Sequence, residues 1–448
     1  MRDVLLGVKP KEGETMTVTK LVTACALSSA ALTAQLTGAA AFTAQSIDPV
    51  VQWNRNLLAI VRTPKAQPAT VHPTRSFAML HAAIYDAVNA IDQTHKPYAV
   101  RFSDVSRRAS QPAAADAAAH DVLVALYPKL ASTLDAEYQQ SLTLVPDGAD
   151  KVEGIRIGQA VAAAILALRN SDGANQPPVP YVFGAAPGDY QSTPPNFPKQ
   201  PQFTHWPSVT PFALKRANQF RPGAPPALTS DRYSDDLNEV QSLGVAGSTA
   251  ATLDEALTGR FWNGAIQNYW NEIAQTASLD RHLTTGQNAR LFALLNLSFA
   301  DSVIAFYDAK YTYNRWRPVT AIRAAGTDDN PETTPDPNWL PEVGNTTPDP
   351  AYPGAHAVIS AAATEVLVAV LQRDRLDFNV TSEVLPGVER SFTSLSAAAE
   401  EATQSRIFAG VHFRNDLTSG HRLGRDVADF VLDHFLTRRH RHEEDDSR

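Results

Sequence analysis

The stretch that decides the fold is NARLFALLNLSFADSVIAFYDAKYTYNRWRPVTAI, residues 288–322. It is apolar over most of its length and is patterned as a helix up to Pro318, whose ring ends or kinks a helix. We interpret it as the longest helix of a helical domain.

Helical patterning dominates the rest of the chain as well. In residues 76–92, apolar side chains recur at three-to-four spacing, which predicts a helix with one buried stripe. That stripe consists of Phe77, Leu80, Ile84 and Val88. Other helical segments are predicted at residues 116–142, 152–173, 234–244 and 261–277, and three more follow residue 354. No stretch combines sustained strand alternation with hairpin turns, so we predict an all-α fold, a helical bundle.

Two segments rich in proline and glycine interrupt the helices, residues 173–230 and 326–353. The first is too long for an ordinary loop, so we expect it to wrap the surface of a compact body. Either a lid or a fixed wall is compatible with this composition.

The composition excludes some classes of partner. The chain has 448 residues, 44% hydrophobic and 19% charged, which suffices for a large core in one or two domains. Its formal net charge is −8 and its pI is near 5.8. Nucleic acid is therefore not an expected partner, and any use of basic residues must be local.

The N-terminus indicates export. After Met16, the sequence has a lysine, an Ala-rich apolar stretch and then small residues, which is typical of a secretory signal over residues 1–41 with translation starting at Met16. A membrane anchor fits less well, because the stretch is rich in Thr, Ser and Gln. The only cysteine, Cys25, lies inside it and leaves a lipoprotein anchor as a second alternative. We expect a secreted or periplasmic protein without a disulfide or a membrane span in the mature chain.

The first of three cationic segments is KYTYNRWRP, residues 310–318. Lys310 and Arg317 are seven residues apart, nearly two helical turns, so both reach from one face if the helix persists. Lysines and arginines on helices are more often solvated, which is the alternative for each of them.

The second segment is YPGAH, residues 352–356, where a helix begins. Gly354 and Ala355 leave main-chain N–H groups open to an anion at the positive end of the helix dipole. His356 would stand at the edge of such a site as a proton donor, or serve as a helix cap or packing residue.

The third segment is SRIFAGVHFRND, residues 405–416. Gly410 allows a break between Arg406 and His412. His412 and Asp416 are four residues apart, so the carboxylate can accept a hydrogen bond from one imidazole nitrogen and leave the other free. A surface ion pair is the alternative.

Three cations, a helix N-terminus and two histidines within about 110 residues suit one ligand, a tetrahedral oxyanion with more than one negative charge. The pattern K-x6-RP, P-x-x-H, SR-x5-H-x3-D resembles the signature that unites vanadium-dependent haloperoxidases with type-2 phosphatidic-acid phosphatases and bacterial acid phosphatases. The matching residues are Lys310, Arg317, Pro318, Pro353, His356, Ser405, Arg406, His412 and Asp416.

The resemblance implies a domain organisation. A family core would span residues 290–437, after an N-terminal helical region at residues 42–289 and before a polar tail at residues 438–448. The fold would be two packed four-helix bundles with the anion site at one end. The full length resembles secreted bacterial haloperoxidase-like proteins more than the membrane phosphatases.

The resemblance also implies a role for each site residue. Lys310, Arg317 and Arg406 would bind the equatorial oxygens of vanadate or phosphate, and the N–H of Ala355 would add a donor. His412, oriented by Asp416, would be the axial ligand of vanadium or the nucleophile that forms a phosphohistidine. His356 would be the acid–base group.

Three activities follow as hypotheses. The leading one is a vanadate-dependent haloperoxidase that oxidises halide with hydrogen peroxide. The second is an acid phosphatase acting on a phosphomonoester, because phosphate has the shape and charge of vanadate. The third is a relative that binds either oxyanion without turnover.

Two positions depart from the family pattern. The motif usually reads P-S-G-H, so Gly354 removes a serine hydroxyl that would donate to the oxyanion, at a cost of about 3 kcal/mol if nothing replaces it. Asp349 lies where haloperoxidases tend to carry an aromatic residue or a histidine near the halide. A carboxylate there would repel anions unless it is protonated or paired, and Arg315 and Arg323 are the candidate partners.

Overall fold

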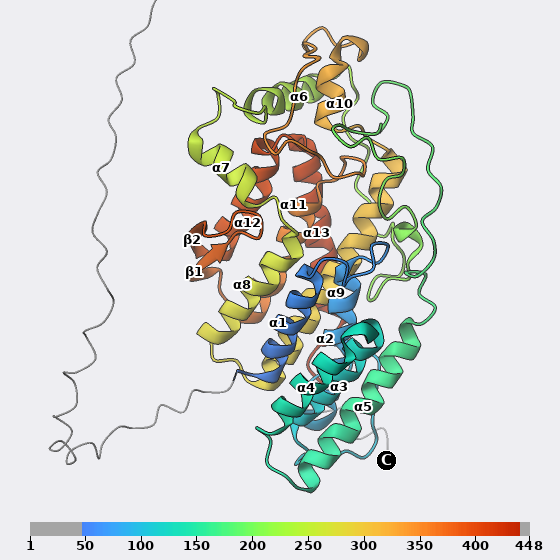
Figure 1. Cartoon of the computed structure of the whole chain (residues 1–448), viewed down its shortest axis with the longest axis vertical. Helices are drawn as coiled ribbons and strands as arrows, with labels where there is room; N and C mark the ends of the chain where they lie inside the picture. Colours follow the sequence, from blue (N-terminus) through green and yellow to red (C-terminus); the bar gives the residue numbers. More distant parts are fainter. Residues whose placement is uncertain (1–46, 440–448) are drawn as a thin grey trace, which may run out of the picture. The chain divides into compact units, whose positions relative to one another are not determined.

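Thirteen α-helices form the fold in residues 47–439, the part of the chain that this computed structural model describes (Figure 1). The all-α prediction is confirmed. The helices are α1 (Pro49–Arg62), α2 (Pro73–Asp92), α3 (Gln111–Leu126), α4 (Ala131–Leu142), α5 (Ala149–Arg169), α6 (Asp231–Leu243), α7 (Leu253–Phe261), α8 (Ile266–Asp280), α9 (Thr285–Tyr313), α10 (Pro318–Arg323), α11 (Ala355–Leu371), α12 (Leu395–Phe408) and α13 (Arg414–His434). Short 3-10 turns are η1 (Pro128–Leu130), η2 (Trp206–Ser208) and η3 (Ala325–Thr327). The predicted signal, residues 1–41, lies outside the described residues.

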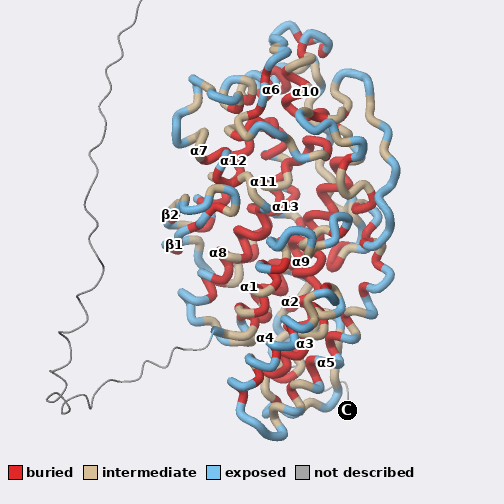
Figure 2. Tube along the Cα trace, in the orientation of Figure 1, coloured by how far each residue is buried: buried red, intermediate tan, exposed pale blue. Residues whose placement is uncertain are grey.

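Helix α9 is the central element and packs against α2, α11 and α13 (Figure 2). It begins with a capping box between Thr284 and Gln287 and ends at Asn314, whose left-handed conformation stops the helix. No membrane span was expected in the mature chain, but α9 has the length and hydropathy to cross a membrane. Its most apolar window is 94% buried within the protein, as in the core helix of a globular domain.

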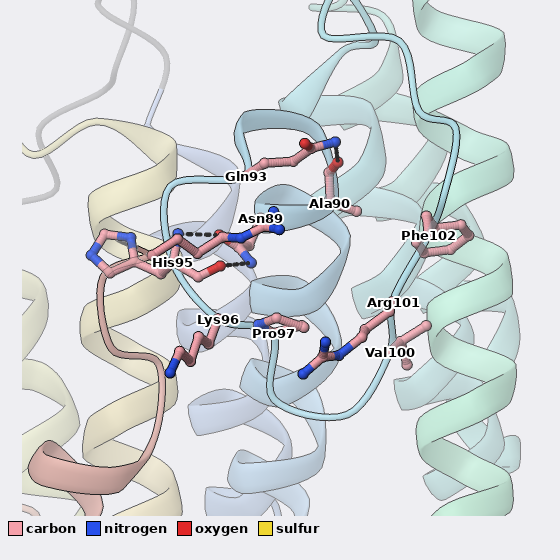
Figure 3. Close-up of a pocket in the computed structure, with 10 residues that line it drawn as sticks. Asn89, Ala90, Gln93, His95, Lys96, Pro97, Val100, Arg101 and Phe102 are labelled. Carbon is pink, nitrogen blue, oxygen red and sulfur yellow. Dashed lines mark hydrogen bonds between the residues drawn. The ribbon is translucent and has the colours of Figure 1, made fainter. Parts of the chain in front are cut away.

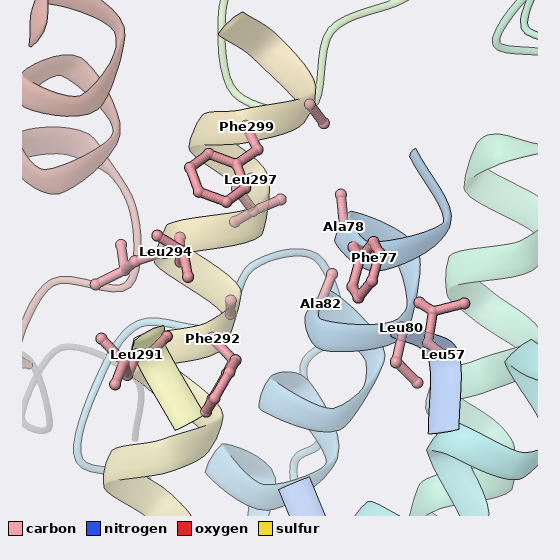
Figure 4. Packing of buried hydrophobic residues seen from close by; sticks show 14 of the residues in the cluster. Leu57, Phe77, Ala78, Leu80, Ala82, Leu291, Phe292, Leu294, Leu297 and Phe299 are labelled. Atoms are coloured by element: carbon pink, nitrogen blue, oxygen red, sulfur yellow. The ribbon is translucent and has the colours of Figure 1, made fainter. Parts of the chain in front are cut away.

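The buried stripe predicted for residues 76–92 lies in the main hydrophobic core. Phe77 and Leu80 of α2 point toward Leu57 of α1, while Phe292 and Leu297 of α9 lie on the other side of α2 (Figure 4). All four stripe residues are at most 1% exposed. Each such side chain contributes about 1.5–3 kcal/mol by leaving water, so this core holds the N-terminal helices together.

Helix α13 approaches α11 closely because it presents two glycines to it. A Cβ on Gly420 would lie 2.7 Å from the main-chain oxygen of Gly354, and a Cβ on Gly424 would lie 2.0 Å from that of Val358. Both contacts are with backbone, which cannot turn aside as a flexible side chain can. The close approach matters because both helices begin at the cationic segments.

We expect Gly424→Ala to lower the free energy of unfolding by about 3 kcal/mol, since the added methyl group must push α11 and α13 apart. Urea denaturation of the purified chain measures this change. Gly223→Ala is the matched control, because a Cβ at Gly223 meets nothing within 4 Å. Equal stability of the two variants would contradict the close packing.

Three details of the secondary-structure prediction are wrong. Residues 116–142 are not one helix, because α3 ends at Leu126 and α4 begins at Ala131, with Pro128 between them. Residues 261–277 are not one helix either, because α7 ends at Phe261 and α8 begins at Ile266, with an Asn-Gly turn between them. A short antiparallel hairpin, β1 (Arg375–Thr381) and β2 (Glu389–Ser394), was not expected. Strand β1 does alternate, with Leu376, Phe378 and Val380 buried between exposed polar residues.

The Pro-rich segment 173–230 is fastened to α9. The carboxylate of Asp301 accepts hydrogen bonds of 2.6–2.7 Å from the consecutive main-chain N–H groups of residues 212–214. The N–H of Tyr190 donates to the oxygen of Asn314 at 2.6 Å, just where α9 ends. In the predicted polar tail, Arg438 pairs with His95 in an isolated β-bridge, so the described start of that tail is not free in solvent.

Candidate active site

The three cationic segments meet where five helices begin or end. Lys310 lies in the last turn of α9, Arg317 precedes α10, and Arg406 lies in the last turn of α12. His412 stands just before α13. Helices α11, α12 and α13 lie together on the side of the bundle toward α6 and α10 (Figure 1). The four side chains are only 1–4% exposed, which excludes the solvated-surface alternative for each of them.

Asp349 pairs with the first two cations. Its Oδ1 lies 3.0 Å from Lys310 Nζ and 2.5 Å from Arg317 Nη2. Burial lowers the pKa of Lys310 to about 8, although the charge of Asp349 opposes this shift. The proposed pairing of Asp349 with Arg315 or Arg323 is wrong, because those two guanidinium groups donate to main-chain oxygens elsewhere.

His412 is held in one tautomer from both sides. Its Nδ1 lies 3.0 Å from Asp416 Oδ2, an oxygen that also accepts from the N–H of Phe413 at 3.1 Å. Its Nε2 lies 3.1 Å from Nη1 of Arg317, which can only donate. Nδ1 therefore carries the proton and Nε2 the lone pair. Burial and then the charge of Arg317 lower the pKa of His412 well below its usual range, so the imidazole is neutral at pH 7.

Arg406 reaches the site because the chain turns sharply after α12. Gly410 has a φ of +77°, and this left-handed residue makes the break that the sequence indicated. The guanidinium of Arg406 donates to the oxygen of Trp262 at 3.5 Å and to Oδ1 of Asn263 at 3.1 Å. Its Nε has no hydrogen-bond partner within residues 47–439. Burial lowers the pKa of Arg406 to about 9.

The turn between α7 and α8 therefore contributes to the site, which the sequence analysis missed. A main-chain oxygen, as at Trp262, has no sequence signature. The Asn-Gly pair at 263–264 does mark a turn and could have ended the predicted helix there.

His356 lies in the first turn of α11, and its Nε2 is 2.8 Å from the oxygen of Trp262. A carbonyl only accepts, so Nε2 carries the proton of the neutral ring and the other nitrogen is the acceptor. Burial and the charge of Arg406 lower the pKa of His356 well below its usual range. The structure thus brings His356 to the site, but its N–H points to a main-chain oxygen.

The start of α11 is tied to the start of α13. The N–H of Gly354 donates to the main-chain oxygen of Asp416 at 3.0 Å. Ala355 is the first residue of α11, so its N–H belongs to the turn that lacks intrahelical acceptors. The expectation that the N–H of Gly354 is open to an anion is therefore wrong, and the N–H of Ala355 is the remaining main-chain donor of the two.

The comparisons with known proteins match the part of the chain that contains these residues. A family profile described as the VCPO second helical-bundle domain matches residues 290–441, which contain all the cationic segments. Vanadium chloroperoxidase from Curvularia inaequalis is 24% identical over 484 aligned positions, covering 82% of this chain and 78% of that protein. The resemblance of the chain to the vanadium-dependent haloperoxidase superfamily is thus confirmed.

Solved structures extend the likeness beyond the site. The first bacterial vanadium-dependent iodoperoxidase superimposes with a TM-score of 0.73 at 25% identity, covering 87% of this chain and 97% of that one. A holo-type bacterial vanadium-dependent chloroperoxidase gives a TM-score of 0.61 at 16% identity, covering 80% and 90% of the two chains, and supports the fold alone.

The residues present in this haloperoxidase relative fit a vanadate ion. Arg406 is a buried cation with neutral acceptors and an unpaired Nε, which is unfavourable unless an anion completes the site. His412 presents the lone pair of Nε2 to the same region. Lys310, Arg317, Arg406 and the first turn of α11 would hold the oxygens, and His412 would ligate the metal.

Restoring the family's serine tests the altered turn. A Cβ on Gly354 would lie 3.0 Å from Cδ2 of Leu417, the movable end of a side chain. We expect Gly354→Ser to bind orthovanadate about 10-fold more tightly, because one oxyanion donor returns at the cost of a small shift of Leu417. Gly354→Ala adds the same Cβ without the hydroxyl and should not gain affinity; isothermal titration calorimetry compares the two. Equal affinities would show that the hydroxyl does not reach the anion.

A pocket of about 360 Å³ leads to Arg406 and Val411, the residue before His412. Its walls include residues 193–196 and Pro198 of the first Pro-rich segment and residues 345–348 of the second. Since both segments are bonded to the helices, they form walls rather than a separate lid in this structure.

Another pocket, of about 350 Å³, lies at the C-terminal end of α2 and is lined by His95, Arg101 and Arg439, among others (Figure 3). There the side-chain amide of Asn89 donates to the main-chain oxygen of His95 and accepts from the main-chain N–H of the same residue. None of the predicted site residues lines this pocket. His72, which interacts electrostatically with Asp349, caps the other end of α2, so the pocket is separate from the candidate site.

Proposed function

We propose that the chain is an exported vanadate-dependent haloperoxidase that oxidises halide with hydrogen peroxide. The observation that supports this most is the neutral His412, with Nδ1 bound to Asp416 and Nε2 directed to the cationic cluster. A neutral imidazole beside several buried cations suits ligation of a metal oxyanion.

Bound vanadate would supply a Lewis acid that polarises hydrogen peroxide toward attack by halide. The chain's own residues bind the oxyanion and orient its ligand. Lys310, Arg317 and Arg406 neutralise the oxyanion, and Asp416 keeps the lone pair of His412 on Nε2. His356, neutral at pH 7, would accept a proton from incoming peroxide and return it to the leaving oxygen.

Acid phosphatase activity is the second candidate. The feature that favours it is the same oriented imidazole, since His412 Nε2 could attack phosphorus and form a phosphohistidine. Asp349 and Gly354 favour the third candidate, oxyanion binding without turnover.

A paired assay on the purified chain distinguishes the three. One arm contains orthovanadate, hydrogen peroxide and chloride, bromide or iodide in turn, and follows halogenation of a dione. The other arm is free of vanadium and follows hydrolysis of nitrophenyl phosphate. We expect vanadate-dependent halogenation, first with iodide, which is the most easily oxidised of the three. Hydrolysis alone would establish the phosphatase, and inactivity in both arms with measurable vanadate binding would establish the third candidate.

Export is a separate part of this proposal, based on the sequence of residues 1–41. Mass spectrometry of protein collected from the medium or periplasm should find an N-terminus near Phe42. Retention of the full-length chain inside the cell would contradict it.

A further inference from the structure

Asp349 occupies the place where an oxyanion would meet two of its cations. The carboxylate is 3% exposed and contacts both Lys310 and Arg317 through Oδ1. Its Oδ2 accepts from Gln202 Nε2 at 2.9 Å, so both oxygens are engaged. Burial would raise the pKa of Asp349, but the charges of Lys310 and Arg317 outweigh burial and lower it, and the group is ionised at pH 7.

The cations do not need this carboxylate to be positioned. Lys310 Nζ also donates to the main-chain oxygens of Pro350 and Ala351. Arg317 donates to the main-chain oxygens of Asp349, at 2.8 Å, and Val411, at 2.9 Å. Neutral acceptors therefore fix both side chains, and the side chain of Asp349 adds mainly a negative charge.

No other cation compensates this charge from the opposite side among the groups described there. Asp349 is approached by Gln202, by the phenol groups of Tyr307 and Tyr311, and by His72. Burial lowers the pKa of His72 to about 3, so its imidazole is neutral. Asp349 is thus the carboxylate in direct contact with these cations, whereas the second acidic group nearby, Asp416, lies behind His412.

We propose that Asp349 is an internal counter-anion that makes the site select singly charged oxyanions over doubly charged ones. Near pH 7.5, orthovanadate is mainly a monoanion, whereas phosphate and phosphomonoesters are mainly dianions. Repulsion by a fixed negative charge acts about twice as strongly on a dianion. Asp349 would therefore favour vanadate over phosphate, and we rest this on the proposed function, in which vanadate is the ion bound.

Isothermal titration calorimetry of the purified full-length chain with orthovanadate and with inorganic phosphate at pH 7.5 tests the selectivity without any measurement of turnover. For Asp349→Asn, which keeps the shape and removes the charge, we expect roughly 10-fold tighter binding of vanadate and roughly 100-fold tighter binding of phosphate. The preference for vanadate should thus fall about 10-fold. Asp349→Ala should show the same change, because the main-chain acceptors of Lys310 and Arg317 remain.

Asp308→Asn is the matched control. Asp308 lies on α9 close to Lys310 but pairs with Arg221, at 2.6 Å, away from the cluster. Its removal should leave the ratio of the two affinities unchanged.

A thermal melt of each variant, with and without phosphate, reports on folding. Without its counter-anion, the cluster should melt at a lower temperature and regain that loss when phosphate binds. An unchanged affinity ratio in both variants, weaker binding of phosphate, or variants that do not fold even with phosphate would each overturn the proposal. Failure of the wild-type chain to bind vanadate would overturn it as well. Failure to oxidise halide while the affinity ratio changes as expected would count against the proposed function alone, since the ratio is measured on binding.

Discussion

Replacing His412 with alanine is expected to abolish halide oxidation and phosphate hydrolysis alike, by about 10⁴-fold or more. The variant removes the imidazole Nε2, fixed by Asp416 and Arg317, that would ligate the metal or attack phosphorus. The cluster itself remains, so an oxyanion should still bind, but more weakly. Initial rates in both arms of the paired assay, together with calorimetry of vanadate binding, measure the two effects separately.

His421→Ala is the control for this prediction. His421 lies on the same helix, α13, and its side chain is exposed, so its loss should leave both rates within about twofold. If His412→Ala kept more than a tenth of the wild-type rate in either arm, the imidazole would be neither a ligand nor a nucleophile. Rescue of the variant by added imidazole would strengthen the assignment.

The helices could be predicted from the sequence because their periodicity records burial directly. The stripe from Phe77 to Val88 is an example: each residue faces the core at the spacing of a helical turn. Strand β1 was missed because its alternation covers only Leu376, Phe378 and Val380, and a single hairpin gives a weak signal beside so many helices.

The candidate site could be predicted only in part. The order of Lys310, Arg317, Arg406 and His412 along the chain marked the cluster, but sequence does not specify which side chain a buried carboxylate meets. Arg315 and Arg317 are two residues apart, and their spacing alone does not show which of them reaches Asp349. In the structure α9 stops before Asn314, and it is the side chain of Arg317 that points to Asp349. The contact of Trp262 with Arg406 and His356 is made by a main-chain oxygen, which any residue type could supply.

Asp416→Ala is expected to lower both activities by about 10³-fold. Removing a partner that orients a metal ligand typically costs 10–100-fold, and placing a catalytic histidine in the wrong tautomer costs ~10⁴-fold, so we expect a loss between the two. The carboxylate accepts from His412 Nδ1 at 3.0 Å and from the N–H of Phe413 at 3.1 Å. Without it, the ring can rotate or move its proton to Nε2, and the lone pair leaves the cluster.

Asp416→Asn separates charge from orientation, because its amide oxygen can still accept both hydrogen bonds while the negative charge is lost. We expect a loss of about 10²-fold for this variant. NMR spectroscopy of ¹⁵N-labelled histidine reads the tautomer independently of turnover: the proton of His412 should remain on Nδ1 in the wild-type and asparagine forms and become mixed in the alanine form. Asp236→Asn is the control. Asp236 accepts a hydrogen bond of 3.0 Å from the N–H of Asn415, the residue before Asp416. Its replacement should leave the tautomer of His412 unchanged and the rate within about threefold of wild type. If Asp416→Ala kept Nδ1 protonated and still lost activity, Asp416 would act through the stability of the α13 start and not through His412.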